Sequence, residues 1–228
     1  MDNRHTSRLR VISLFEDLPE AELSRVAQSC VTQSYERHAE ISGAEDAAND
    51  VFFVLEGSVR AEEVTAGGRE IIFGDIGVGE ILGEFSAIDG LPRSSAMIAI
   101  TDCVVARMPA EKFLKIVREN SAVSTRLIKL LVAKIRRMSQ RVFEVSALAV
   151  RERVRRELLR LAADGTPAGK GVVIRPSPSH YEFAARIGSH REAVTRELNH
   201  LEEAKIVAIG RREIRILDLA RLRQGEEE

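Results

Sequence analysis

Glycine, glutamate, arginine and serine gather in one short stretch of the chain, residues 83–95. Glycine lets backbone N–H groups approach a phosphate closely, and an arginine can donate two hydrogen bonds to phosphate oxygens. A serine hydroxyl adds a donor, and a carboxylate accepts from a sugar hydroxyl. The stretch predicts a site for a small molecule with a phosphate and a ribose; a β-turn with a surface Glu–Arg pair is the alternative. The candidate ligand residues are Gly83, Glu84, Phe85, Ser86, Arg93, Ser94 and Ser95.

A second group of polar side chains lies near the C-terminus, on two segments with helix-capping signatures. In both segments a serine is followed three residues later by a glutamate, at residues 179–182 and 189–192. Gly188 separates the two segments, and residues 206–217 read as a hairpin that turns at residues 210–212. Two short helices joined by a tight glycine turn predict a helix-turn-helix, and the hairpin predicts its wing.

The N-terminal end of the second helix is the part of such a fold that touches base edges. Its arginines can each donate two hydrogen bonds to guanine, and Glu192 can accept one from cytosine. The alternative for Glu192 is that it only closes the capping box on Ser189. The candidate DNA-binding residues, phosphate contacts included, are Ser179, His180, Tyr181, Ser189, His190, Arg191, Glu192, Thr195, Arg196, Arg211 and Arg212.

The elements around residues 83–95 read as short β-strands separated by turns. Val51 begins a β-branched and aromatic run, and further strand-like runs cover residues 58–65, 70–73 and 95–108. Short strands with turn signals about every ten residues are typical of a sandwich or small barrel. A helical entry over residues 13–30 precedes them. We therefore expect a rigid β frame that holds the glycine-containing connection.

A long helix is predicted after Pro109, because apolar residues recur there at alternating steps of three and four. Such a heptad seam with basic flanks favours pairing with a second copy of the chain; packing on its own β module is the alternative. Ser139 lies directly after one seam residue, at the edge of the predicted interface. The seam residues are Ile128, Leu131, Ile135, Met138, Val142, Val145 and Ala149.

Composition and charge argue against several other classes of protein. The 228 residues include only two cysteines, Cys30 and Cys103, which argues against a disulfide scaffold, a zinc site or an iron–sulfur cluster. The histidines are scattered and no nucleophile–base pair is visible, so an enzyme has little support. Residues 11–109 hold 6 basic and 18 acidic side chains, whereas residues 151–225 hold 16 basic and 10 acidic ones. This asymmetry favours a polyanion as the partner of the C-terminal part.

The order of these motifs resembles the cyclic-AMP receptor protein (catabolite activator, CRP/FNR) family of transcription regulators. The resemblance rests on residues 83–86 with Pro92-Arg93-Ser94-Ser95, and on an Arg-Glu-x-Val-x-Arg motif over residues 191–196. It implies an α+β fold in three parts. These are a jelly-roll-like cyclic-nucleotide-binding β-roll over residues 1–110, a dimerisation helix over residues 111–149, and a winged helix-turn-helix DNA-binding domain over residues 150–228.

The family pattern also implies roles for single residues. The phosphate would bind Arg93 and Ser94, the ribose Glu84, and the purine Ser139 of the partner subunit; an exposed helix serine without a role is the alternative for Ser139. Two positions depart from the pattern, His38 where the family has glycine and Met138 where it has threonine. The second departure leaves the base preference open.

The function implied is that of a cyclic-nucleotide-dependent, sequence-specific DNA-binding transcription regulator, with cyclic AMP favoured and cyclic GMP left open. Its partners would be double-stranded DNA with a near-palindromic site, a second copy in a homodimer, and RNA polymerase through the loop at residues 164–171; no metal is implied. The charged first ten residues predict no signal peptide, and no apolar run is long enough to span a bilayer, so we expect a cytoplasmic protein. Two alternatives stay open: a ligand-independent regulator of the same fold, and a nucleotide-gated module that binds protein.

Overall fold

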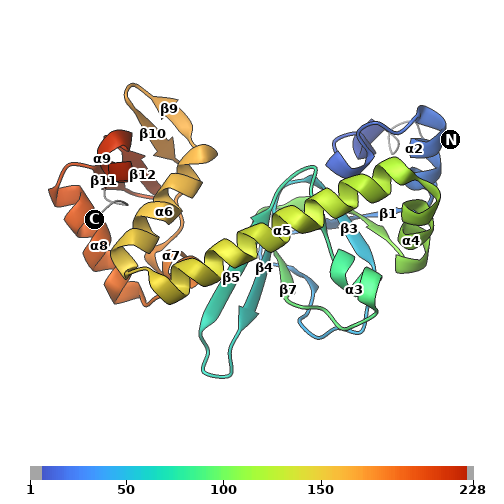
Figure 1. Cartoon of the computed structure of the whole chain (residues 1–228), viewed down its shortest axis with the longest axis horizontal. Helices are drawn as coiled ribbons and strands as arrows, with labels where there is room; N and C mark the ends of the chain where they lie inside the picture. Colours follow the sequence, from blue (N-terminus) through green and yellow to red (C-terminus); the bar gives the residue numbers. More distant parts are fainter. Residues whose placement is uncertain (1–6, 225–228) are drawn as a thin grey trace. The chain divides into compact units, whose positions relative to one another are not determined.

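The computed structural model describes residues 7–224 of the chain (Figure 1). Its contacts divide the chain into two compact units, residues 1–135 and residues 136–228, and each unit has a hydrophobic core of its own. Part of the charged N-terminal segment, for which we predict no signal peptide, lies outside the described residues. Within residues 7–224 no helix is both long enough and apolar enough to cross a membrane.

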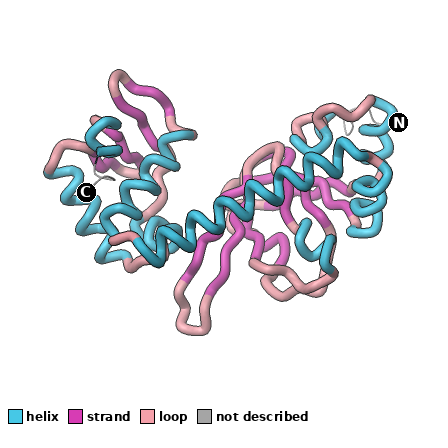
Figure 2. Tube along the Cα trace, in the orientation of Figure 1, coloured by secondary structure: helices cyan, strands magenta, loops and turns pink. Residues whose placement is uncertain are grey.

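The N-terminal unit is built on two four-stranded antiparallel sheets, whose strands are magenta in Figure 2. One sheet has the order β1-β8-β3-β6 and the other the order β2-β7-β4-β5. In chain order the strands are β1 (Val31–Tyr35), β2 (Glu40–Ser42), β3 (Val51–Glu56), β4 (Val59–Val64), β5 (Glu70–Ile76), β6 (Ile81–Leu82), β7 (Ala96–Ala99) and β8 (Cys103–Met108).

Strand β3 is buried on both of its faces, which explains its unbroken apolar sequence. Phe52 and Val54 point between the two sheets, where they pack with residues of β4, β6, β7 and β8. Val51 and Phe53 point to the opposite face and pack with the helical segments of this unit. Successive side chains of a strand alternate between its faces, so β3 belongs to both layers of the core.

The strand predicted over residues 95–108 is wrong as a single element. The structure breaks it into β7 and β8, which belong to different sheets. The chain turns from one sheet to the other through residues 100–102, as strands do at the corner of a sandwich. The predicted helical entry is present in two pieces, a 3₁₀ turn at Ser13–Phe15 and helix α2 at Glu20–Gln28.

Two helices follow the β-strands where one long helix was predicted. Helix α4 (Ala110–Glu119) ends at Asn120, whose backbone is extended, and α5 (Ser121–Ala147) begins directly after it. The Asn120 side-chain oxygen accepts hydrogen bonds from the N–H groups of Ala122 and Val123, and so caps the first turn of α5.

Helix α5 carries most of the predicted heptad seam. Its first half buries Val123 and Leu127 in the core of the N-terminal unit, and Leu131 packs partly against the same core. Ala149 lies beyond the end of α5, so its predicted place in the seam is wrong. The seam residues that remain exposed are Ile128, Ile135, Met138, Val142 and Val145.

Within its described residues, the C-terminal unit contains the end of α5, four further helices and one four-stranded sheet in the order β11-β12-β10-β9. Buried side chains of α6, α7, α8 and the sheet form a single core. After the end of α5 its elements are α6 (Val150–Ala163), β9 (Thr166–Ala168), β10 (Gly171–Ile174), α7 (His180–Ile187), α8 (Arg191–Glu203), β11 (Val207–Gly210), β12 (Glu213–Ile216) and α9 (Leu219–Gln224).

The helix-turn-helix and its wing are confirmed, and one loop prediction is wrong. Helices α7 and α8 are separated by Gly188, and β11 pairs with β12 around a turn at residues 211–212. The predicted loop at residues 164–171 contains β9, which pairs with β10. Pro167 cannot donate a hydrogen bond to a sheet, but β9 is an edge strand, where proline is tolerated.

Candidate functional site

Arg93 is the central side chain of the stretch at residues 83–95, which connects β6 to β7 and includes helix α3 (Glu84–Asp89). It is only 3% exposed, and its guanidinium donates to the carbonyl oxygens of Asp50 at 2.7 Å and Gly83 at 3.1 Å. The ring of Phe52 lies 5.5 Å below the guanidinium carbon. The β frame thus holds a buried cation at the start of β3, which is the placement expected for an anion-binding residue.

The buried guanidinium is not fully paired. Burial lowers the pKa of Arg93 below its ordinary value, while the charges of Asp50, Asp46 and Glu84 act in the opposite direction. Its Nε atom is buried without a hydrogen-bond partner among the described residues. A buried N–H without an acceptor costs free energy unless a ligand supplies one, so the arrangement fits a phosphate group.

Glu84, the predicted ribose contact, is held by a lysine from a distant part of the chain. It is 2% exposed, and its Oε1 lies 2.6 Å from the Nζ atom of Lys134 on α5. Lys134 also donates to the carbonyl oxygen of Ile81, and its Nζ atom lies 5.5 Å from the centre of the Phe85 ring. Lys134 is one of the basic residues that flank the predicted seam, and no local sequence pattern links it to Glu84, which is 50 positions away.

The remaining predicted ligand residues differ in exposure. Ser86 and Ser95 are buried, with exposed fractions of 1% and 9%. Ser94 and Phe85 are exposed. Ser139 is an exposed residue of α5 and belongs to the C-terminal unit. Ser94 and Phe85 are therefore the exposed polar and aromatic side chains among the predicted residues of this loop.

Gly83→Ala should disrupt the loop at residues 83–95. The new Cβ atom would lie 2.6 Å from the Asp50 carbonyl oxygen and would collide with the guanidinium of Arg93. The backbone φ of 78° adds strain for any side chain, so we expect urea denaturation to show a loss of about 1–3 kcal/mol. Gly90→Ala is the matched control, since Gly90 ends the same helix at φ 73° with nothing within 4 Å of an added Cβ. Equal losses in the two variants would mean that the collision costs nothing.

Helix α7 begins with the predicted capping box, but α8 does not. The Ser179 hydroxyl accepts from the Glu182 N–H, and the Glu182 carboxylate accepts from the Ser179 N–H. The second box, predicted for Ser189 and Glu192, is absent because α8 starts one residue later, with His190 as its N-cap. Glu192 therefore does not occupy the third position of the helix, and its carboxylate is exposed rather than used as a cap.

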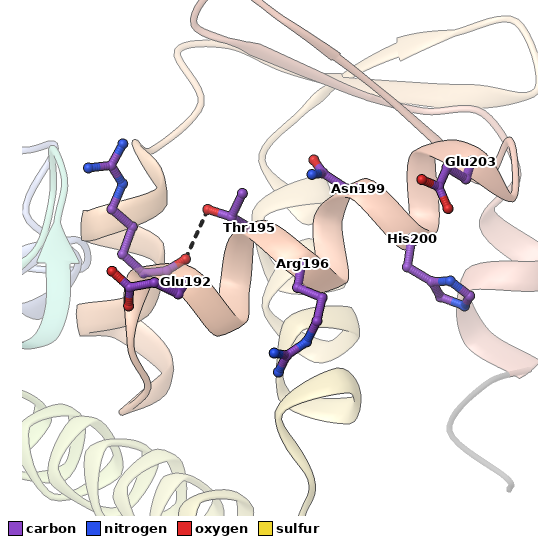
Figure 3. Close-up of a pocket in the computed structure, with 7 residues that line it drawn as sticks. Glu192, Thr195, Arg196, Asn199, His200 and Glu203 are labelled. Atoms are coloured by element: carbon purple, nitrogen blue, oxygen red, sulfur yellow. Dashed lines mark hydrogen bonds between the residues drawn. The ribbon is translucent and has the colours of Figure 1, made fainter.

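The exposed side of α8 forms a continuous polar face beside a hollow of about 660 Å³ (Figure 3). Arg196 is a prominent member, with 73% of its side chain exposed. The spacing of three and four residues continues the face beyond Arg196 by another two turns. Three members of this face, Asn199, His200 and Glu203, were not among the predicted contacts, although the same spacing points to them. The residues that line the hollow are Arg191, Glu192, Thr195, Arg196, Asn199, His200 and Glu203.

His180 and Thr195, both predicted to contact DNA, contact each other. The Nδ1 atom of His180 lies 2.8 Å from the Thr195 hydroxyl, which in turn donates to the Arg191 carbonyl oxygen at 2.9 Å. Burial, and then the charge of Arg191, lower the pKa of His180, which favours the neutral ring. The first residue of α7 is thereby tied to the face of α8.

The other predicted DNA contacts lie around α7, α8 and the wing. Tyr181, His190, Arg211 and Arg212 are exposed. Ser189 is only 9% exposed. Arg212 has a positive φ of 57° in the turn between β11 and β12. The wing therefore presents two adjacent arginines at its tip.

A buried charge network joins the end of α5 to α6 and α7 within the C-terminal unit. Glu144 and Glu157 are each 2% exposed. Arg160 donates to both oxygens of Glu144 at 2.9 Å and to Glu157 at 2.8 Å. Arg141 and Arg186 lie within 3.6 and 3.7 Å of Glu157. Buried charges of this kind are costly to leave unpaired, so the network fixes how these three helices meet.

The comparisons with known proteins agree with this architecture. The cyclic nucleotide-binding domain model matches residues 32–120, and the Crp-like helix-turn-helix domain model matches residues 152–224. The Cyclic AMP receptor protein of Thermus thermophilus is 30% identical over 179 residues, which cover 78% of this chain and 80% of that protein.

Two solved structures share the fold. A variant of CooA from Carboxydothermus hydrogenoformans has a TM-score of 0.77 at 21% identity and covers 89% of this chain and 90% of its own. The c-di-GMP responsive global regulator CLP of Xanthomonas campestris has a TM-score of 0.74 at 22% identity, with 88% and 99% covered. These relatives are regulators rather than enzymes. With an α+β fold, a cyclic nucleotide-binding domain and a Crp-like helix-turn-helix in this order, the chain belongs to the CRP/FNR family of transcription regulators.

Proposed function

We propose that this regulator binds a cyclic nucleotide in the stretch at residues 83–95 and then binds DNA as a homodimer. The observation that carries the proposal is the buried guanidinium of Arg93, whose Nε atom has no hydrogen-bond partner among the described residues. A cyclic phosphate would accept from Arg93 and from the exposed hydroxyl of Ser94. The ribose would be bound by the Glu84 carboxylate. This carboxylate would then either bind the ribose and Lys134 together or give up its ion pair with Lys134.

Cyclic AMP is the favoured ligand in this proposal, and cyclic GMP is the second candidate. The name of the Thermus thermophilus relative supports the first. The name of the Xanthomonas campestris neighbour is a reminder that a similar fold can serve another nucleotide. The purine would contact Ser139 of the partner subunit, next to Met138 where the family pattern has threonine.

The exposed seam of α5 supports pairing with a second copy of the chain. Ile135, Met138 and Val142 are 61%, 56% and 66% exposed, and a run of large apolar side chains at this spacing is typical of a helix pair. Two copies of α8 would then enter successive major grooves about 34 Å apart, which requires a near-palindromic site. A ligand at Glu84 and Arg93 would favour DNA binding only if it prefers that paired geometry.

The polar face of α8 supports the DNA contacts. Arg191 and Arg196 would each read a guanine, and Glu192, which is free of a capping box, would read a cytosine. Tyr181, Arg211 and Arg212 would bind phosphates and fix the register. The segment at residues 164–171, which contains β9, is the proposed contact for RNA polymerase, and the cytoplasm is the proposed location.

Calorimetric titration of the full chain with cyclic AMP and cyclic GMP tests the ligand, followed by DNA selection with each nucleotide bound. We expect micromolar binding of one nucleotide and salt-sensitive DNA affinity that depends on it. DNA binding of full strength without nucleotide would instead select a ligand-independent regulator. Nucleotide binding without any salt-sensitive DNA affinity would select a signalling module that binds protein.

A further inference from the structure

Thr195 occupies the middle of the polar face of α8, yet its hydroxyl is already engaged on both sides. The oxygen lies 2.9 Å from the Arg191 carbonyl oxygen and 2.8 Å from Nδ1 of His180. A threonine side chain has only two branches, a hydroxyl and a methyl group. The two hydrogen bonds therefore fix the χ1 angle and with it the direction of the methyl group.

Only one placement of the protons satisfies both bonds. A carbonyl oxygen can only accept, so the single hydroxyl proton of Thr195 faces the Arg191 carbonyl. The hydroxyl then has to accept from His180, whose Nδ1 atom must carry the ring proton. Thr195 thus has no proton to donate to the acceptors that line the major groove, such as N7 of a purine or O4 of thymine.

The methyl is the branch of Thr195 that neither hydrogen bond engages. The dashed line at Thr195 in Figure 3 is the hydrogen bond from its hydroxyl to the Arg191 carbonyl oxygen, and the other branch of the side chain, the methyl, is turned away from this bond. Thr195 lines the hollow together with Arg191 and Arg196, one turn before it and one residue after it. The thymine methyl is the one apolar feature that a base pair displays in the major groove, and a threonine methyl is suited to contact it.

We propose that Thr195 reads the 5-methyl group of a thymine in each half-site, next to the guanines read by Arg191 and Arg196. The inference rests on the proposed DNA-binding function. A 5-methylcytosine at the same position presents the same methyl group and would be accepted equally by this contact.

Replacing thymine by deoxyuridine in the selected DNA site removes only the methyl group and tests the proposal directly. We expect one position per half-site at which the wild-type protein binds about 4-fold more weakly, from the loss of one buried methyl group. Fluorescence anisotropy with duplexes substituted at one thymine at a time measures this ratio. Substitution at the remaining thymines should leave the affinity unchanged.

Three variants separate the methyl from the hydroxyl. Thr195→Ser keeps both hydrogen bonds and lacks the methyl. The ratio of its affinities for the thymine and the deoxyuridine duplex should therefore fall to one. Thr195→Val lacks the hydroxyl and keeps a methyl branch, so it should retain discrimination. Arg196→Ala is the matched control, because it should weaken binding and leave the ratio unchanged.

Different results would overturn the proposed DNA-binding function and the proposed role of the Thr195 methyl group. Absence of DNA binding by the wild-type protein would overturn the proposed function itself. Specific DNA binding with equal affinity for thymine and uracil at every position would overturn the role of the Thr195 methyl. Discrimination that persists in Thr195→Ser would assign the thymine contact to another residue.

Discussion

Arg93→Ala should weaken the binding of cyclic AMP about 100-fold or more. The guanidinium is the buried cation of the proposed phosphate site, and hydrogen bonds to charged groups contribute about 1.5–3 kcal/mol each. Loss of two such bonds corresponds to about 3 kcal/mol, or about two orders of magnitude in the dissociation constant. Isothermal titration calorimetry on the full chain measures the change.

The same side chain also supports the carbonyl groups of Asp50 and Gly83, so the variant must be shown to be folded. Arg93→Lys keeps the charge without the planar fork and should give an intermediate affinity. Arg107→Ala is the matched control, because Arg107 pairs with the Asp50 carboxylate at 3.2 Å but is 45% exposed. Its affinity for cyclic AMP should equal that of the wild type. Unchanged affinity in a folded Arg93→Ala protein would contradict phosphate binding at this position.

Glu157→Gln should destabilise the C-terminal unit by about 3–5 kcal/mol. Glu157 is one of the two buried carboxylates of the charge network, and it balances Arg141, Arg160 and Arg186. Removing one partner of a buried charge pair leaves the others uncompensated, which costs far more than losing a surface pair. Chemical denaturation monitored by circular dichroism measures the loss.

Glu152→Gln is the control for this change, since Glu152 lies on the same helix and forms its ion pair with Arg151, which is 58% exposed. It should cost less than about 1 kcal/mol. If both variants lost equal stability, the effect would belong to the helix rather than to the buried network.

The network also makes the stability of the C-terminal unit depend on pH, in a direction that follows from the pKa of Glu144. Burial acts to raise the pKa of Glu144, but the hydrogen bonds and the charge of Arg160 outweigh it, so the pKa is lowered. A carboxyl with a lowered pKa stabilises the folded state above its ordinary titration range, and this contribution is lost as the pH falls through the lowered value. Stability should therefore decrease on acidification, and Glu144→Gln should flatten that part of the profile.

Features set by neighbouring residues were the ones that the sequence predicted well. The capping box at Ser179 and the turn at Gly188 depend on a few adjacent positions, so they were found with α7. The box at Ser189 has the same spacing and does not form, because the backbone enters α8 one residue later than the pattern suggests. Helix boundaries are set by tertiary packing to within a residue or two, which the local pattern does not contain.

Contacts between distant residues could not be predicted. The sequence placed Glu84 and Arg93 in one site, but not Lys134 against Glu84, because that ion pair joins residues that are 50 positions apart. The buried charge network was missed for the same reason, since its arginines read as the solvated face of a basic helix. Asn199 and His200 were missed because the prediction stopped at Arg196, although they lie three and four residues further along α8.

The backbone amides of strand β3 should have the slowest hydrogen exchange in the N-terminal unit. Because its side chains are buried on both faces, its amide hydrogens cannot reach water by the opening of one layer alone. Their exchange should report the global unfolding of the unit, while the amides of the β4–β5 hairpin exchange by local opening. Arg93 is bonded to the carbonyl oxygen of Asp50, the residue directly before β3. The proposed phosphate contact is therefore anchored to the segment of the unit that we expect to open last.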